Sequence, residues 1–142
     1  VDLTSNAWAY HGLACLYLKS DPEKAKQFIM EGMALQRERL SYQKEGFKIL
    51  EKCGAYKEID EEYKKQTTEN QKNGRIQYYY VAALEKLERN EEAYHLLNDG
   101  DGMDVSDIRE GDSDIQSIWE RLHEKVYGEK GHLPHYYNFK VN

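Results

Sequence analysis

The stretch "YYYVAALEKLERNEEAY", Tyr78 to Tyr94, contains the features that decide the fold. Apolar residues at helical spacing lead into the polar turn "LERNEEA", and apolar residues resume at Ala93. We expect Asn90 to cap a second helix, with Glu91 and Glu92 near the positive end of its dipole. The stretch therefore predicts two helices joined by a short turn.

The three consecutive tyrosines of this stretch leave several roles open. Tyr78, Tyr79 and Tyr80 point about 100° apart on a helix, so they cannot all enter one core. Core packing, the floor of a ligand-binding surface and a membrane-facing belt are the alternatives, and the set must divide its roles.

The hairpin repeats along the chain at intervals of 34 residues. Moving the sequence by this period aligns five sets of residues without gaps and superposes the turns "KSDPEKA", "CGAYKEI" and "LERNEEA". The sets are Trp8, Tyr42 and Ile76; Leu13, Phe47 and Val81; Leu16, Leu50 and Leu84; Ala25, Ile59 and Ala93; and Ile29, Tyr63 and Leu97. Five sets and three turns in one register predict a repeated unit of two helices.

The turn of the first unit is well marked. Asp21 is suited to cap a helix, Pro22 to its first position, and Glu23 to the positive end of its dipole. A hairpin of this length cannot bury both of its apolar faces alone, so neighbouring hairpins are expected to stack, and about three units make a stable array.

From Ser5 to about Gly100 this pattern resembles the tetratricopeptide repeat (TPR) family. The small residue that the family has in its second helix is present as Ala25 and Ala93, whereas Ile59 replaces it in the middle unit. The proline that usually ends a unit is absent. The resemblance implies an all-α, right-handed superhelical stack of three TPR-like hairpins over residues 5–100, within a single domain of residues 1–142.

The period stops after residue 100. We expect an acidic loop over residues 101–112, a capping helix over residues 113–128 and an extended tail over residues 129–142. Ser113 and Gln116 have the spacing of a capping box, and Gly128 is placed to end the helix. One face of this helix carries Ile115, Ile118, Trp119, Leu122 and Val126. A helix with a single apolar stripe is suited to cover the last repeat, with Trp119 at the centre of the contact.

The motif "IREG", Trp119 and the closing "LP" at Leu133 and Pro134 are similar to the C-terminal part of large bacterial proteins. In those proteins an N-terminal β-sandwich region, akin to sugar-processing domains, precedes TPR-like units. This resemblance implies an accessory or oligomerisation domain of a carbohydrate-active protein, with any catalytic residues outside the chain.

The charge and apolar content of the sequence limit the classes of partner that are expected. The net charge of −6 and a pI near 5.4 disfavour nucleic acid and anionic membranes, which reward clustered Lys and Arg. No apolar run approaches the roughly 20 residues that span a bilayer. We expect a soluble, cytoplasmic protein, unless an upstream targeting signal has been removed. Cys15 and Cys53 have no metal-type spacing and are expected to be reduced, buried thiols.

Metal and catalytic motifs are weak. Asp99, Asp101 and Glu110 match places in a calcium-binding EF-hand loop, but Asp104 stands where that loop requires glycine. His132 and His135 are three residues apart, and the other histidines have no spacing that completes a zinc site. No phosphate-binding loop, nucleophile elbow or HExxH helix is present. We therefore expect no enzyme, cofactor or metal site in this chain.

In TPR-like stacks the first helix of each unit lines a concave groove. Six residues of these helices are expected to hold a partner: Tyr10, Tyr17, Lys44, Lys48, Arg75 and Tyr78. Tyrosine offers contact area and a polar tip at low entropic cost. The hypothesis is a non-catalytic interaction or scaffolding module that binds a protein, a peptide or another domain of the same polypeptide, with a homo-oligomer as an open alternative.

Overall fold

The computed structural model describes residues 3–99 and 115–129, and within these ranges the protein is all-helical with no strand. The prediction of an all-α fold is confirmed. The helices are α1 (Leu3–Tyr17), α2 (Pro22–Leu35), α3 (Leu40–Lys52), α4 (Tyr56–Lys64), α5 (Thr68–Gln71), α6 (Gly74–Lys86), α7 (Asn90–Asn98) and α8 (Ile115–Tyr127). The predicted acidic loop and tail lie outside the described residues, apart from the tail's first position.

The helices form two compact units, Val1–Asn70 and Gln71–Asn142. Unit 1 contains α1 to α4, unit 2 contains α6 to α8, and the short helix α5 crosses the boundary. The three predicted hairpins correspond to α1 with α2, α3 with α4, and α6 with α7. The single domain that the sequence predicted stays a prediction.

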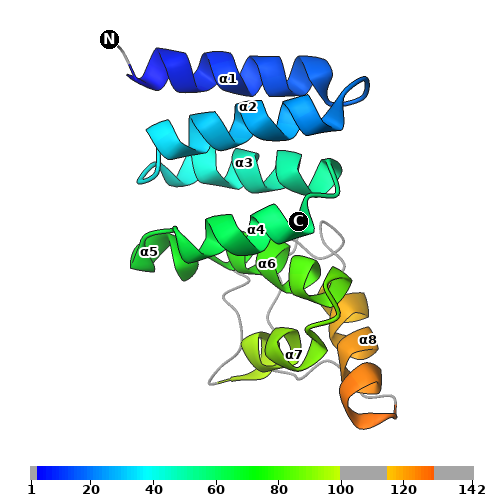
Figure 1. The fold of residues 1–142 in the computed structure, drawn as a ribbon. Coiled ribbons are helices and arrows are strands. Elements are labelled where there is room, and N and C mark those ends of the chain that lie inside the picture. The colour runs from blue at the N-terminus through cyan, green and yellow to red at the C-terminus, as the bar shows by residue number, and fades with distance from the viewer. Residues whose placement is uncertain (1–2, 100–114, 130–142) are drawn as a thin grey trace, which may run out of the picture. The chain divides into compact units, whose positions relative to one another are not determined.

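Unit 1 is a row of helices in which each packs against the next, from α1 through α2 and α3 to α4 (Figure 1). The turn into α2 is built as its sequence predicts. Asp21 Oδ1 accepts a hydrogen bond from the backbone N–H of Lys24 at 3.2 Å, and Pro22 takes the first helical position. The cap and the proline therefore fix where α2 begins.

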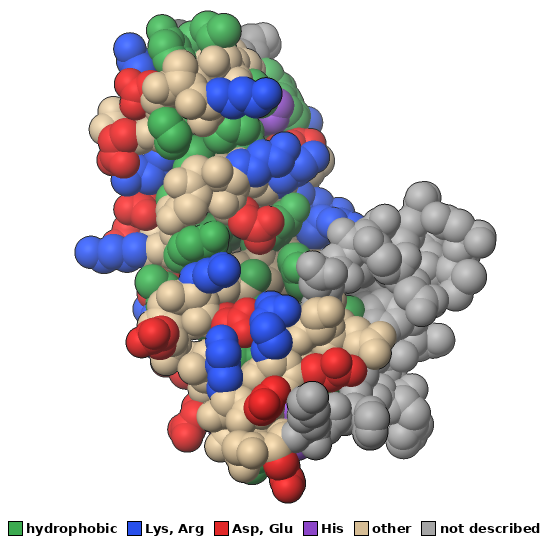
Figure 2. Space-filling model, turned by 90° about the vertical axis from the view of Figure 1, so that its right-hand side faces the viewer, with side chains coloured by type: hydrophobic (Ala, Val, Ile, Leu, Met, Phe, Trp, Pro, Cys, Tyr) green, Lys and Arg blue, Asp and Glu red, His purple; other side chains and the backbone are tan. Residues whose placement is uncertain are grey.

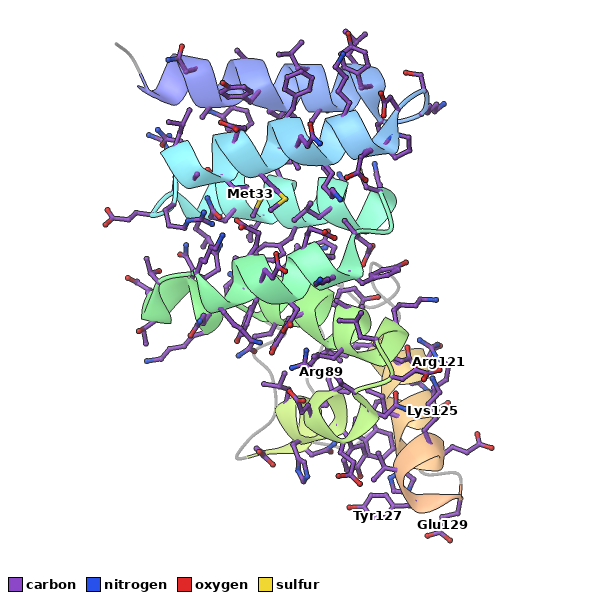
Figure 3. The ribbon with its side chains drawn as sticks, in the orientation of Figure 1. Met33, Arg89, Arg121, Lys125, Tyr127 and Glu129 are labelled. Carbon is purple, nitrogen blue, oxygen red and sulfur yellow. The ribbon has the colours of Figure 1, made fainter. Side chains whose placement is uncertain are left out.

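Close contacts between α2 and α3 depend on two glycines. Met33 of α2 points toward α3 (Figure 3) and lies against Gly46, where a Cβ would come within 2.4 Å of the Met33 sulfur. Gly32 receives the ring of Tyr42 in the same way, and the Tyr42 hydroxyl donates a hydrogen bond to the carbonyl oxygen of Ala7 in α1. Tyr42 thus ties three helices together from one buried position.

A buried polar network holds the turn between α2 and α3 against α4. Gln43 Nε2 donates to the carbonyl oxygens of Met33 at 3.0 Å and Gln36 at 2.7 Å, and Gln66 Nε2 donates to Gln43 Oε1 at 2.7 Å. Glu62, whose side chain is 2% exposed, accepts a hydrogen bond from Arg37 at 2.6 Å. Each of these groups has a hydrogen-bond partner, which offsets part of the cost of removing it from water.

Unit 2 packs α7 between α6 and α8, with fewer contacts between α6 and α8. Asn73 caps α6 by accepting from the backbone N–H groups of Arg75 and Ile76 at 3.0 and 3.2 Å. The predicted capping helix is present as α8, and Trp119 is buried with its ring nitrogen donating to Asn98 Oδ1 at 2.8 Å. Gly128 follows α8 with a positive φ of 74°, as expected of a helix end.

The 34-residue register recurs in the structure at two helix ends. Gly54 after α3 and Glu88 after α6 are 34 residues apart, and both have left-handed backbones, with φ of 69° and 63°. The hydrogen bonds that close the two turns also correspond: Ala55 N to Leu50 O and Arg89 N to Leu84 O, each at 2.9 Å. The middle and third hairpins therefore share one turn geometry.

Burial follows the register only in part. In the second helices Ile29 and Leu97 are fully buried, whereas the equivalent Tyr63 is half-buried. Ala25, Ile59 and Ala93 are all fully buried. Leu50 and Leu84 are also fully buried, whereas Leu16 at the equivalent place is 71% exposed. The same holds for Leu13 and Trp8, which are 37% and 38% exposed although their equivalents in α3 and α6 are buried. These α1 residues therefore differ in their surroundings from their equivalents in α3 and α6.

Two local expectations are corrected. The helix α7 is preceded by Arg89 as its cap residue, and Asn90 is its first helical residue, with no hydrogen bond to its side-chain oxygen. The two cysteines are free thiols, as expected, but Cys15 is exposed and Cys53 is half-buried. Cys15 lies on a helix that is apolar around much of its circumference, so an apolar neighbourhood in sequence does not place it in the core.

Candidate functional site

Helix α1, "LTSNAWAYHGLACLY", contains no Asp, Glu, Lys or Arg. This is unusual in a chain in which 32% of residues are charged. A surface helix normally has one apolar stripe and an opposite charged face, and a helix that is apolar all round is normally buried. The composition of α1 therefore suits a helix covered on more than one side.

The buried side of α1 carries Ala7 and Ala14, which are fully buried. On the opposite side, at i, i+3, i+4 and i+7, lie four uncharged residues that we call the α1 face: Ala9, Gly12, Leu13 and Leu16. All four are exposed, and Figure 2 shows hydrophobic side chains gathered at the end of unit 1 that α1 forms. The α1 face is an apolar surface without a cover among the described residues.

A groove adjoins the α1 face where α1 packs against α2. It has a volume of about 480 Å³ and is open to solvent. Its lining residues are Asn6, Ala9, Tyr10 and Leu13 of α1 with Glu31 and Leu35 of α2. Ala9 and Leu13 belong to both features, so the groove and the α1 face form one continuous surface.

Of the six predicted partner-binding residues, two meet in the structure. Tyr10 and Tyr17 lie two turns apart on α1, and both rings pack on Phe28 of α2, with ring centroids 6.2 and 5.8 Å from it. The Lys24 ammonium lies 4.6 Å from the centre of the Tyr17 ring, within the range of a cation–π contact. Both tyrosines are half-buried, so each packs within the α1–α2 hairpin and is still partly exposed to solvent.

The other four predicted residues lie on α3 and α6. Lys44 and Lys48 are one turn apart on α3 in unit 1, half-buried and exposed respectively. Arg75 and Tyr78 are three residues apart on α6 in unit 2, and both are half-buried. That all six residues line one concave groove stays a prediction.

The three tyrosines divide their roles, as the helical spacing requires. Tyr79 and Tyr80 are buried at 7% exposure each, and Tyr78 is half-buried with its ring centroid 5.9 Å from that of Tyr79. Two of the three therefore serve the core of unit 2.

An aromatic cluster in unit 2 joins α7 to α8. The hydroxyl of Tyr94 lies 2.9 Å from His123 Nδ1, and the His123 ring stacks on Trp119 with centroids 5.0 Å apart and planes inclined by 14°. The exposed ring of Tyr127 packs against both Tyr94 and His123, at 5.3 and 5.0 Å. These contacts hold α8 on α7 through side chains that all have ring partners.

A buried carboxylate joins α6 to α8. Glu85 has a side chain only 6% exposed and accepts two hydrogen bonds from Arg121, at 3.0 and 2.8 Å, and one from Lys125 at 3.0 Å. Arg121 and Lys125 project from the same side of α8 (Figure 3). Burial acts to raise the pKa of Glu85, but the hydrogen bonds and charges of Arg121 and Lys125 outweigh it, so the pKa is lowered. Glu85 is thus a structural anion.

The chemistry of the described residues is sparse. No group of three His, Cys, Asp or Glu side chains in them is arranged to hold a metal ion. Burial raises the pKa of the Cys53 thiol, which disfavours the nucleophilic thiolate. Of the residues considered for calcium and zinc, Asp101, Asp104, Glu110, His132 and His135 lie outside the described ranges. None of the described helices has the length and apolar content to span a bilayer.

The α1 face was missed by periodicity alone. Leu13 and Leu16 fit the apolar pattern of a packed helix, and that pattern does not show whether a neighbour covers them. The signal that identifies the face is the absence of charge from all 15 residues of α1. Comparison of the chain with protein-family models, with curated proteins and with solved structures gives no match.

Proposed function

We propose that this protein is a non-catalytic protein-interaction module that binds its partner through the α1 face and the adjoining groove. The observation that carries the proposal is the exposure of Leu16 and Leu13 on a helix with no charged residue. Exposed apolar residues that gather on one surface mark interaction sites more often than scattered ones do.

The neighbouring residues suit recognition of a protein. Tyr10 borders the groove and offers an aromatic surface with a polar hydroxyl, a combination that is enriched at interfaces. Glu31, on the α2 side of the groove, supplies a charge at the rim. An apolar centre with a polar edge is the usual composition of a specific protein interface.

Quantitative capture experiments test this function. The immobilised chain is compared with a Leu13→Ser/Leu16→Glu variant for the proteins that each recovers from the source cells. We expect at least one protein to be recovered by the wild-type chain and lost with the variant. Because both substituted residues are exposed, circular dichroism of the two chains should be the same. Equal recovery of every protein would contradict the proposal.

A second variant tests the three cationic residues among the six that the TPR resemblance implies. Lys44→Ala/Lys48→Ala/Arg75→Ala removes three cations from α3 and α6 and leaves the α1 face intact. Loss of a partner with this variant, and not with Leu13→Ser/Leu16→Glu, would place binding in the predicted groove of first helices instead of on α1.

A further inference from the structure

The α1 face corresponds, residue by residue, to a buried face of α3. Moving Ala9, Gly12, Leu13 and Leu16 by 34 positions gives Gln43, Gly46, Phe47 and Leu50. All four of these α3 residues are buried. The same positions are therefore covered in the second hairpin and open in the first.

The structure shows a helix that lies on the α3 face. Gly46 is filled by Met33 of α2, and Gln43 donates hydrogen bonds to the carbonyl oxygens of Met33 and Gln36 at the end of α2. At Gly12, the equivalent of Gly46, a Cβ would have no atom within 4 Å. Among the described residues, no helix covers Gly12 as α2 covers Gly46, and no side chain takes the place that Met33 takes over Gly46.

We infer that the α1 face binds a helix equivalent to α2. This helix belongs to a further helical hairpin, which stacks on α1 as α2 stacks on α3. This inference rests on the proposed function and specifies the partner. The occupant is an amphipathic helix with an apolar stripe, and one long, flexible apolar side chain enters the space over Gly12. Ala9 and Gly12 allow close approach of the two backbones, and Leu13 and Leu16 supply the apolar area.

The absence of charge on α1 fits this occupant. A charged residue on the α1 face would lose its hydration when a helix covered it, at a cost that burial of leucine could not offset. The α3 face likewise contains no charged residue, although α3 as a whole contains several. The two faces share the composition that helix-on-helix packing requires.

A duplicated form of the chain tests this inference, because its added hairpin supplies the helix that is expected on the α1 face. In a duplicated chain, residues 1–39 are followed directly by residues 6–142, so the added α2 precedes the original α1 with the spacing that joins α2 to α3. The added copy carries Leu16→Met, which gives its peptides a distinct mass. Hydrogen exchange then reports on the original α1 alone. We expect its amides to exchange about tenfold more slowly, or slower still, than in the unduplicated chain.

The matched control is the same duplicated chain with Met33→Asp in the added copy only. This change removes the side chain expected over Gly12 and brings a charge to the interface, so the protection of the original α1 should be lost. Gly12→Met in the original α1 gives a second control. It has room in the unduplicated chain and should abolish the protection in the duplicated one.

Two results would overturn the inference. The first is equal exchange of the original α1 in the duplicated chain and in its Met33→Asp control, whether or not the added hairpin is helical. The second is a concentration-dependent dimer of the unduplicated chain in sedimentation velocity that Leu16→Glu dissociates, which would make the occupant a second copy. The duplication needs no external partner, so its outcome is separate from that of the capture experiments.

Discussion

Met33 of α2 fills the space over Gly46 of α3 so closely that a methyl group at residue 46 would lie 2.4 Å from the Met33 sulfur. Gly12 has the equivalent place in α1 and faces open space. The two glycines share a position in the 34-residue register and differ only in whether a helix covers them. Substitution of each by alanine separates these conditions.

Gly46→Ala should destabilise unit 1 by about 1–2 kcal/mol, because the added methyl group displaces Met33 in a packed interface. Gly12→Ala should stabilise it by about 0.5–1 kcal/mol, since alanine is the better helix former and meets no neighbour. Urea denaturation measures both. Met33→Ala should suppress most of the cost of Gly46→Ala, and a Gly46→Ala chain as stable as wild type would contradict the packing of α2 on α3.

The three register-equivalent leucines should respond differently to truncation. Leu50→Ala and Leu84→Ala each remove a fully buried side chain and should cost about 2–5 kcal/mol. Leu16→Ala removes one that is 71% exposed and should change the free energy of unfolding by less than about 0.5 kcal/mol. Chemical denaturation of the three variants provides the comparison. A large loss with Leu16→Ala would mean that the α1 face is already covered in solution.

Gly54 after α3 and Glu88 after α6 both have a left-handed backbone. Removing glycine from the first place and introducing it at the second should therefore have opposite effects on stability. Glu88 has a φ of 63°, which strains a residue with a side chain, so Glu88→Gly should stabilise unit 2 by about 0.5–1 kcal/mol. Gly54→Ala should destabilise unit 1 by about 1 kcal/mol, because it introduces the same strain where glycine now avoids it. Thermal unfolding of both variants tests this, with Glu88→Ala as the control that keeps the strain and removes the charge. A Glu88→Ala chain as stable as Glu88→Gly would assign the gain to charge.

Acid should weaken the attachment of α8 to α6. The pKa of Glu85 is lowered below its ordinary value of 4.5, so the folded state holds its proton less strongly than the unfolded state does. The stability from this group is complete above pH 4.5 and is lost as the pH falls through the lower, folded-state pKa. Hydrogen exchange of α8 should therefore accelerate below about pH 4, relative to α3 as an internal reference. In Glu85→Gln this dependence should disappear, and an unchanged acid dependence would contradict the assignment.

Helix positions were largely predictable from the sequence, because spacing of apolar residues and turn chemistry are local. Asp21, Pro22 and Gly128 have the expected roles, and α8, Ile115–Tyr127, lies within the predicted residues 113–128. Burial was less predictable, because periodicity identifies the apolar side of a helix and not which neighbour covers it. Leu16 and Leu50 have the same pattern around them, yet only Leu50 has a helix against its face. Helix α7 begins at Asn90, one residue earlier than predicted, so Arg89 takes the cap position that was expected for Asn90. A difference of one or two residues is usual at helix ends.

Alkaline pH should weaken unit 1 through Tyr42. Burial, assisted by the nearby Cys15 thiol, raises the pKa of the Tyr42 hydroxyl from 10.0 to about 12. The unfolded chain therefore loses this proton first, so the stability from neutral Tyr42 is complete below pH 10 and falls as the pH rises from 10 toward 12. The loss over this interval should be about 2 kcal/mol. The hydroxyl also donates a hydrogen bond to Ala7, which ionisation would remove.

Tyr42→Phe provides the matched comparison, since it keeps the ring that packs over Gly32 and removes only the hydroxyl. At pH 7 the variant should be less stable by about 1 kcal/mol, because the buried carbonyl of Ala7 loses a hydrogen-bond donor. Between pH 10 and 11.5 the difference should shrink and then reverse, as wild-type stability falls through ionisation that phenylalanine cannot undergo. Urea denaturation at a series of pH values measures the two curves. Parallel curves up to pH 11.5 would show that Tyr42 ionises equally easily in the folded and unfolded states, and would contradict its buried place between α1, α2 and α3.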